Sequence, residues 1–286
     1  MKAVILAAGQ GTRLKPLTNR VPKPLVRLHG KPIMQRQLES LDKAGFEQCV
    51  IVIGYRGDQV EYQFGPRFQN LEISYVNNER YEETNNIYSL WMARDLLDDD
   101  ILLLEGDLVF EDDLLDDLAQ KTYPDIAVVD WFRSTMDGTV VFAENGLAES
   151  MALKSQQSEE FDYTYALKTV NIYSLSRGTM KRRFLPALDG YVGAGHTNSF
   201  YEAVLAELVA QGRLEMAVHL TGDRKWTEID TVEDLREAEA LFPVAAFARD
   251  RGAVSETPES VMLGRDPNHP GQAEYDRRPW QRRERP

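Results

Sequence analysis

Short apolar runs rich in β-branched residues alternate with helical patterns through the first half of the chain. The runs are predicted strands, and they cover residues 3–6, 50–53, 72–76, 101–104 and 126–129. Apolar residues at helical spacing lie between them, over residues 34–44, 58–64, 85–97 and 112–120. Alternation of this kind gives parallel strands with helices on both faces. The pattern therefore predicts an α/β fold with a Rossmann-like, mixed and mostly parallel sheet.

The second half of the chain has a different hydrophobic pattern. Shorter alternating runs at residues 139–142, 147–153 and 168–173 predict antiparallel strands added to the sheet. Later segments predict two helices, two more strands and a last helix, at residues 177–188 and 199–211, near Met216 and Thr227, and at residues 232–241. We expect residues 1–248 to form a single domain. Residues 249–286 hold five prolines and eight arginines, a composition that predicts a disordered or surface-draped tail.

Net charge, hydropathy and cysteine content indicate which partners and which compartment the chain is suited to. A net charge of −13 argues against nucleic acid and anionic membrane surfaces, because both need a basic footprint on the protein. No apolar stretch approaches the roughly 20 residues of a membrane span. The one cysteine, Cys49, permits no intrachain disulfide, and residues 1–6 show no signal-peptide pattern. These features predict a cytoplasmic protein with no membrane or nucleic-acid partner; a homodimer remains open.

A loop of small residues follows the first predicted strand. It reads Leu-Ala-Ala-Gly-Gln-Gly-Thr-Arg-Leu from Leu6 to Leu14, and Pro-Lys-Pro-Leu follows from Pro22. Small residues let backbone N–H groups approach a polyphosphate closely. Arg13 adds a cation, and the prolines on either side of Lys23 lower the entropy cost of presenting its ammonium. The segment matches neither the dinucleotide G-x-G-x-x-G pattern nor the ATPase P-loop, and it predicts a phosphate site.

Two aspartates stand just beyond predicted strands. Asp107 follows Leu-Leu-Leu-Glu-Gly, and Asp230 follows Trp-Thr-Glu-Ile, before the last predicted helix. Mg²⁺ prefers hard oxygen ligands and commonly takes one or two carboxylates together with substrate phosphates. Each residue also has a structural interpretation, Asp107 as a turn residue and Asp230 as a helix cap. As metal ligands, the two carboxylates predict a Mg²⁺ cofactor.

The glycine loop with Pro-Lys-Pro-Leu resembles the N-terminal motif of the sugar-phosphate and choline-phosphate nucleotidylyltransferases, and the resemblance covers roughly residues 1–242. It implies a fold of the nucleotide-diphospho-sugar transferase type. It also implies catalytic roles for Arg13, Lys23, Asp107 and Asp230, with the last two as metal ligands. The implied nucleotide-binding loop consists of Leu6, Ala7, Ala8, Gly9, Gly11, Thr12 and Arg13. In such a reaction the acceptor's phosphate oxygen attacks the α-phosphorus, pyrophosphate leaves, and no nucleophilic side chain is needed.

A polar segment narrows the choice of nucleotide. Thr-Asn-Asn-Ile-Tyr-Ser-Leu, from Thr84 to Leu90, resembles the phosphocholine and aminoethylphosphonate cytidylyltransferase branch. It favours CTP over UTP, dTTP or ATP, and it adds Thr84, Asn85, Asn86 and Ser89 to the nucleotide site. Helix capping is a sufficient alternative explanation for these side chains.

The acceptor is expected to lie against residues of about 130–230. A small amino or quaternary ammonium head group needs aromatic faces and carboxylates, and a phosphonate needs cations. The residues predicted to bind it are Trp131, Lys154, Lys168, Asn171, Tyr201, Glu202 and Glu228. The predicted function is CMP transfer from CTP to 2-aminoethylphosphonate, 2-hydroxyethylphosphonate or phosphocholine. A sugar-1-phosphate nucleotidylyltransferase using UTP or dTTP, and a non-catalytic nucleotide-binding regulator, are the alternatives.

Overall fold

The computed structural model describes residues 1–119 and 123–243, so the predicted tail at 249–286 lies outside the described residues. The described strands are β1 (Lys2–Ala7), β2 (Arg27–Leu28), β3 (Lys31–Pro32), β4 (Gln48–Ile53), β5 (Arg67–Phe68), β6 (Leu71–Asn77), β7 (Ile101–Glu105), β8 (Leu108–Phe110), β9 (Ile126–Trp131), β10 (Val140–Glu144), β11 (Leu147–Ala152), β12 (Leu167–Leu175), β13 (Ala217–Leu220) and β14 (Trp226–Glu228). The described α-helices are α1 (Ile33–Lys43), α2 (Gly57–Phe64), α3 (Asn86–Met92), α4 (Leu114–Ala119), α5 (Arg177–Thr179), α6 (Leu185–Gly193), α7 (Glu202–Ala210) and α8 (Val232–Leu241).

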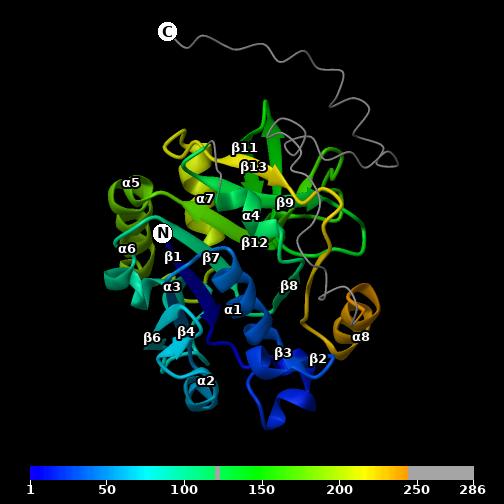
Figure 1. The fold of residues 1–286 in the computed structure, drawn as a ribbon. Helices are drawn as coiled ribbons and strands as arrows, with labels where there is room; N and C mark the ends of the chain where they lie inside the picture. Colours follow the sequence, from blue (N-terminus) through cyan, green and yellow to red (C-terminus); the bar gives the residue numbers. More distant parts are fainter. Residues whose placement is uncertain (120–122, 244–286) are drawn as a thin grey trace.

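Most of the long strands join one mixed sheet, in the order β10-β11-β13-β9-β12-β7-β1-β4-β6-β5 (Figure 1). Parallel pairing joins β7, β1, β4 and β6, and it also joins β9 to β13. Strand β12 runs antiparallel to both β7 and β9, its neighbours in the sheet. Its N-terminal half therefore reaches the edge where β1 and β7 end, and this edge carries the site described below. The mixed α/β sheet predicted from the sequence is confirmed.

Alternation along β1 explains the layers on the two faces. Val4 and Leu6 belong to one buried cluster, which also contains residues of α3, α6 and α7. Ala3, Ile5 and Ala7 belong to a second, which contains residues of α1, α2 and α4. Successive side chains of a strand point to opposite faces, so a strand that is apolar throughout is buried on both.

A separate two-stranded sheet, β14-β8, links the last helix to the main sheet. Glu228 of β14 pairs with Leu108 of β8, in antiparallel register. Helix α8 follows directly and lies beside β2 (Figure 1). Ile229 and Phe242 are fully buried in a third cluster beneath α8, together with Leu14 and Leu28 from the first part of the chain. Residues near 230 are thereby fixed against the start of the chain.

Several element boundaries differ from the sequence pattern. The helix predicted at residues 85–97 ends as α3 at Met92, and Arg94–Leu96 forms a 3₁₀ turn. The helix predicted at 177–188 consists of α5, a π-helical turn at Met180–Phe184, and α6, which extends to Gly193. The helix predicted from residue 199 begins at Glu202. Within the described residues, no helix combines the length and the apolar composition required to cross a membrane.

Candidate active site

A cavity of about 840 Å³ lies at the edge where β1 and β7 end and where β12 begins. Its walls come from the glycine loop after β1, the segment before α3, the ends of β7 and β14, and the N-terminal half of β12. The predicted site residues on its wall are Leu6, Ala7, Ala8, Gly9, Gly11, Thr12, Arg13, Lys23, Thr84, Asn85, Asn86, Ser89, Asp107, Lys154, Lys168, Asn171, Glu202, Glu228 and Asp230. The structure thus brings together residues from both halves of the chain.

Gly11 packs directly against the stem of Lys23. Its φ angle is 61°, and an added Cβ would lie 3.0 Å from Lys23 Cβ and 3.1 Å from Thr18 Cγ2. The Thr18 hydroxyl donates a 2.8 Å hydrogen bond to the Gly11 carbonyl, which holds the loop in this shape. A side chain at position 11 would be strained and would collide with Lys23. The absence of a side chain at Gly11 therefore allows the Lys23 side chain to pack against the backbone of the loop.

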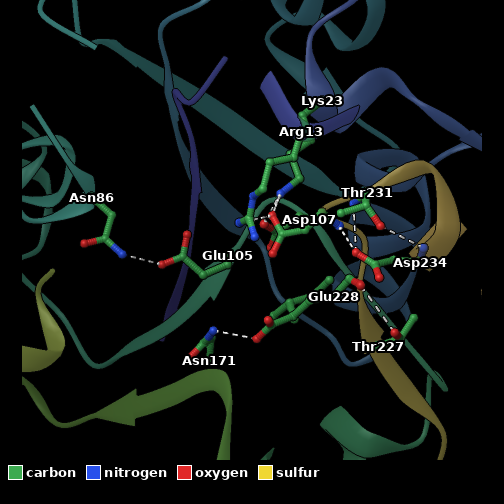
Figure 2. Close-up of polar contacts among 12 residues, drawn as sticks. Arg13, Lys23, Asn86, Glu105, Asp107, Asn171, Thr227, Glu228, Thr231 and Asp234 are labelled. Atoms are coloured by element: carbon green, nitrogen blue, oxygen red, sulfur yellow. Dashed lines mark hydrogen bonds and ion pairs between the residues drawn. The ribbon is translucent and has the colours of Figure 1, made fainter. Parts of the chain in front are cut away.

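Lys23 reaches both of the predicted metal ligands. Its Nζ lies 2.5 Å from Asp107 Oδ2 and 2.7 Å from Asp230 Oδ1. Arg13 Nη2 lies 2.9 Å from the same Asp230 oxygen. Figure 2 shows Arg13 and Lys23 side by side above Asp107.

Burial and these ion pairs act on the pKa values in opposite directions. Burial alone would lower the pKa of Lys23, but the charges of Asp107 and Asp230 raise it above its ordinary value. Burial would raise the pKa of Asp230, but Lys23 and Arg13 hold it below its ordinary value. Lys23 and Asp230 are therefore both charged near neutral pH, and they form one cluster with Arg13 and Asp107.

Hydrogen bonds hold the backbone around both aspartates. The buried Gln37 of α1 donates from Nε2 to the carbonyls of Glu105 and Leu108, 2.9 Å from each, which fixes the turn that contains Asp107. The Ile229 N–H donates a 3.0 Å bond to the Asp107 carbonyl, so the ends of β7 and β14 are directly joined.

Thr231, not Asp230, caps α8. Thr231 Oγ1 accepts from the N–H of Asp234, and Asp234 Oδ2 accepts from the N–H groups of Thr231 and Asp230. This reciprocal arrangement is a capping box. The carboxylate of Asp230 is consequently turned toward the cavity.

The residues present fit a divalent cation. Two carboxylates converge on one point, and that point already holds the ammonium of Lys23. Among the described residues, no group of three or more His, Cys, Asp or Glu side chains is arranged to hold a metal ion. Mg²⁺ commonly uses one or two protein carboxylates and completes its shell with phosphates and water. Asp107 and Asp230 supply such a partial set.

The segment before α3 forms a fixed polar surface. Asn85 caps α3, its side chain accepting a 2.8 Å bond from the N–H of Asn86. The buried Asn78 donates from Nδ2 to Thr84 Oγ1 at 3.1 Å and to Ser89 Oγ at 3.0 Å. Capping therefore explains Asn85, as the sequence allowed, while Thr84 and Ser89 are oriented by a residue that the sequence analysis did not single out.

Asn171 is turned toward the cavity by an irregularity in β12. The pairing of β12 with β9 shifts register between Thr169 and Tyr173, and Asn171 adopts φ 59°. Asparagine tolerates this left-handed region better than most residues, and bulges commonly redirect a side chain. Asn171 Nδ2 donates a 2.7 Å bond to Glu228 Oε1 (Figure 2). Lys168 Nζ lies 3.2 Å from the same oxygen.

Trp131 and Tyr201 are corrections to the predicted acceptor site, because neither lines the cavity. Trp131 is 5% exposed and lies on the face of β9 that carries Ala127 and Val129, inside the first hydrophobic cluster. Tyr201 is fully buried in the same cluster and packs edge-on against Tyr173, with ring centroids 5.8 Å apart. The two-residue period of β9 puts Trp131 on the same face as Ala127 and Val129.

Three glutamates line the cavity together: Glu202 is buried, and Glu105 and Glu228 are half-buried. Glu202 is 5% exposed, and its Oε2 has no hydrogen-bond partner among the described residues. Burial raises the pKa of Glu202 to about 7. Burial, and then the charges of Asp107 and Glu202, raise the pKa of Glu105 well above its ordinary value. Burial also raises the pKa of Glu228, although the charge of Lys168 opposes the shift.

Glu105 lines the cavity but was not predicted from the sequence as a site residue. It accepts a 2.9 Å bond from Asn86 Nδ2, which links the end of β7 to the start of α3 (Figure 2). The available signal was a carboxylate inside the apolar run Leu-Leu-Leu-Glu before Gly-Asp. Asn78, Tyr81, Asp137 and Phe200 also line the cavity and were not predicted. Asp137 forms a 2.8 Å ion pair with Lys154, and both side chains are more than half exposed.

Known proteins with similar sequences decide the family. The model of the nucleotidyl transferase family matches residues 2–243. The chain belongs to this family. It is therefore an enzyme, a nucleotidyl transferase, as the glycine loop and the Pro-Lys-Pro segment indicated.

This nucleotidyl transferase is 34% identical over 243 residues to the CMP-5'-(3-aminopropyl)phosphonate synthase of Streptomyces rubellomurinus; the match covers 85% of the chain and 39% of that synthase. It is 29% identical to the 2-aminoethylphosphonate cytidylyltransferase of Lancefieldella rimae, over 82% of this chain and 89% of that one. The fold is similar to that of the CTP:phosphocholine cytidylyltransferase of Streptococcus pneumoniae. That comparison gives a TM-score of 0.67 at 22% identity and covers 84% of this chain and 98% of the other.

Proposed function

We propose that this enzyme transfers CMP from CTP to a small aminoalkylphosphonate and releases pyrophosphate, with Mg²⁺ as its cofactor. One observation carries the choice of acceptor. The buried Glu202 lines the cavity and has one carboxylate oxygen without a hydrogen-bond partner among the described residues, while the two aromatic side chains predicted to contact the acceptor, Trp131 and Tyr201, are packed in the core.

The nucleotide is proposed to bind against the glycine loop and the segment before α3. Arg13 and Lys23 supply positive charge for the phosphates beside Gly11, where no side chain obstructs the approach. Asn78 holds both the Thr84 and Ser89 hydroxyls. Ser89 can donate to a base edge from this fixed position, whereas Thr84 already donates to the Arg80 carbonyl and can only accept. The names of the two sequence relatives reported above, a CMP-phosphonate synthase and a cytidylyltransferase, support CTP as the donor.

Catalysis is proposed to rest on positioning and charge neutralisation. A phosphonate oxygen of the acceptor attacks the α-phosphorus of CTP, a new P–O bond forms, and the bond to the β-phosphate's bridging oxygen breaks. Lys23 and Arg13 stabilise the negative charge of the phosphates as pyrophosphate leaves. Asp107 and Asp230 would hold Mg²⁺, which when bound supplies further neutralisation at the phosphates. No side-chain nucleophile is required.

The acceptor's ammonium group is proposed to lie between Glu202 and Glu105. The charge of Glu202 disfavours the ionised form of Glu105, and a bound cation would relieve that repulsion. A primary ammonium has three N–H donors, which the unpartnered Glu202 oxygen can accept. A quaternary ammonium has no N–H donor for these carboxylates and depends on aromatic faces, of which Tyr81 and Phe200 line the cavity. An aminoalkyl group is proposed over choline because its N–H donors match the carboxylates of Glu202 and Glu105.

The acceptor's phosphonate is proposed to contact Lys168. This ammonium is 1% exposed and donates to the Thr169 carbonyl at 2.6 Å as well as pairing with Glu228. A lysine has three donors, so one remains for the acceptor. Lys154 lies at the rim of the cavity and forms an ion pair with the exposed Asp137. An exposed ion pair contributes little to stability, so a phosphonate can replace Asp137 as the partner of Lys154.

The test is a pyrophosphate-release assay of four NTPs against aminoethylphosphonate, hydroxyethylphosphonate, phosphocholine and glucose 1-phosphate. We expect CTP with aminoethylphosphonate to give the highest kcat/KM. Hydroxyethylphosphonate has the same phosphonate without the ammonium, so its kcat/KM should be at least about tenfold lower. Equal rates for the two phosphonates would remove Glu202 from recognition. A preference for glucose 1-phosphate with UTP would refute the acceptor assignment, and a protein with no turnover that still bound CTP would be a regulator.

A further inference from the structure

The predicted metal position, between Asp107 and Asp230, holds the protein's own cation, the ammonium of Lys23. Lys23 Nζ lies within 2.7 Å of one oxygen from each aspartate, and Arg13 adds a second positive charge at Asp230 Oδ1. Two carboxylates and two cations leave this cluster with no net charge. A divalent cation that approached it would meet little attraction and direct repulsion from two neighbouring positive groups.

The same two cations face the phosphate side of the cavity. Both Lys23 and Arg13 line the cavity together with the glycine loop, and the stem of Lys23 touches Gly11. Lys23 lies between two prolines in a 3₁₀ turn, Lys23–Leu25, so its backbone is fixed and the ammonium moves through side-chain rotation alone. A triphosphate on the loop offers several negative oxygens to these groups, and a lysine that turns to them releases Asp107.

We infer that Lys23 acts as a placeholder for the metal, so that the enzyme acquires its affinity for a divalent cation only when nucleotide phosphates draw Lys23 away. The inference rests on the proposed function, since it takes Asp107 and Asp230 as the metal ligands. It specifies the regulation of that site: nucleotide and metal bind with positive coupling, and by linkage each strengthens the other. Metal that lacks nucleotide is excluded by an internal ion pair.

The experiment measures Mn²⁺ binding to nucleotide-free protein from the loss of the free-ion signal in electron paramagnetic resonance. Wild-type protein should bind Mn²⁺ weakly. Lys23→Met, which keeps the length of the side chain and removes its charge, should bind at least tenfold more tightly, and Lys23→Gln should behave alike. Lys31→Met is the matched control: Lys31 is paired with Glu39 at 2.6 Å, and neither residue lines the cavity. Its Mn²⁺ affinity should stay within twofold of wild type.

A double variant tests whether the gain in Mn²⁺ affinity arises at the two aspartates. Adding Asp107→Asn to Lys23→Met should abolish the gain, because one of the two carboxylates is lost. A gain that survives this change would overturn the inference, as would wild-type protein that binds Mn²⁺ as tightly as Lys23→Met. Circular dichroism of each variant verifies folding.

Pyrophosphate release by the wild type separates this inference from the proposed function. Tight Mn²⁺ binding to the free wild type, together with normal turnover of CTP and aminoethylphosphonate, would refute the placeholder alone. A tenfold gain in Lys23→Met, in a protein that turns over no NTP with any acceptor, would support the placeholder and refute the proposed reaction.

Discussion

Lys23 Nζ lies 2.5 Å from Asp107 Oδ2, although 84 residues separate the two along the chain. Three features of the fold produce this contact. Strand β1 and strand β7 are parallel neighbours, so the loop after one lies beside the turn after the other. Gln37 fixes that turn, and Gly11 allows Lys23 to lie against the loop. The chemistry proposed above depends on this convergence.

Removal of either aspartate should abolish most activity without unfolding the protein. We expect Asp107→Ala or Asp230→Ala to lower kcat by about 10²–10⁵-fold, because the proposed metal site loses one of its two carboxylates. Asp98→Ala is the control, since Asp98 pairs with Lys2 on the exposed surface. Steady-state rates at saturating Mg²⁺ make the measurement. A near-normal rate in either cavity variant would exclude that residue from the mechanism.

Glu202 should make acceptor binding depend on pH. Its pKa is raised to about 7, so the carboxylate is ionised above that pH and protonated below it. The KM for aminoethylphosphonate should therefore fall as pH rises through about 7. Glu202→Gln should keep a high KM at every pH. Hydroxyethylphosphonate shares the acceptor's phosphonate ionisation but has no ammonium, and a pH profile identical to that of aminoethylphosphonate would contradict this role.

The same pKa shift has a cost in stability. The raised pKa means that the folded protein binds the Glu202 proton more tightly than the unfolded chain does, so the contribution of Glu202 to stability falls as pH rises from the ordinary 4.5 to about 7. Glu202→Gln should consequently be more stable than wild type at pH 8, by on the order of 1–3 kcal/mol. Urea unfolding at pH 5 and pH 8 measures it. A variant that was less stable at pH 8 would show that the ionised carboxylate is well compensated.

Trp131 should matter for stability rather than for the acceptor. It is buried in the first hydrophobic cluster, so Trp131→Ala should destabilise the protein by about 3–5 kcal/mol. The KM for aminoethylphosphonate should change less than twofold in protein that remains folded at 15 °C. A large rise in that KM, with an unchanged free energy of unfolding, would show that Trp131 contributes to acceptor binding rather than to stability.

Gly106 should be intolerant of a methyl group. An added Cβ would lie 2.8 Å from Ala7 Cβ and 2.9 Å from the Leu6 carbonyl oxygen, so the turn that carries Asp107 would have to move. We expect Gly106→Ala to cost about 1–3 kcal/mol and to lower kcat. Gly190→Ala is the matched control, because nothing lies within 4 Å of its added Cβ in helix α6. Equal stability and activity in the two variants would contradict the tight approach.

The sequence was sufficient for the parts of the site that depend on local chemistry. The glycine loop, Lys23 between its prolines, and two aspartates just after strand patterns are all visible as short motifs. The order of strands and helices follows from hydrophobic period, which is why β1, β4, β6 and β7 were located to within two residues. Helix α8 was predicted with its observed limits, although the cap is formed by Thr231 with Asp234 and not by Asp230, the residue that the sequence offered for this role.

Contacts between distant segments could not be predicted in this way. The β14-β8 pairing, which brings Asp230 to Asp107, joins residues more than 100 positions apart and leaves no local pattern. The bulge at Asn171 depends on the register of β12 against β9. Trp131 was assigned by its chemical type, although the period of β9 already placed it on the core face. Glu105 was overlooked because a carboxylate at the end of a strand resembles an exposed residue until its neighbours are known.

The central claim is tested most directly by competition in a single reaction. Purified enzyme is given equal concentrations of CTP and UTP together with equal concentrations of aminoethylphosphonate, phosphocholine and glucose 1-phosphate, and the products are quantified early by mass spectrometry. Product ratios then report the ratios of kcat/KM. We predict that the mixed anhydride of CMP and aminoethylphosphonate dominates. A mixture dominated by CDP-choline or UDP-glucose would contradict the account.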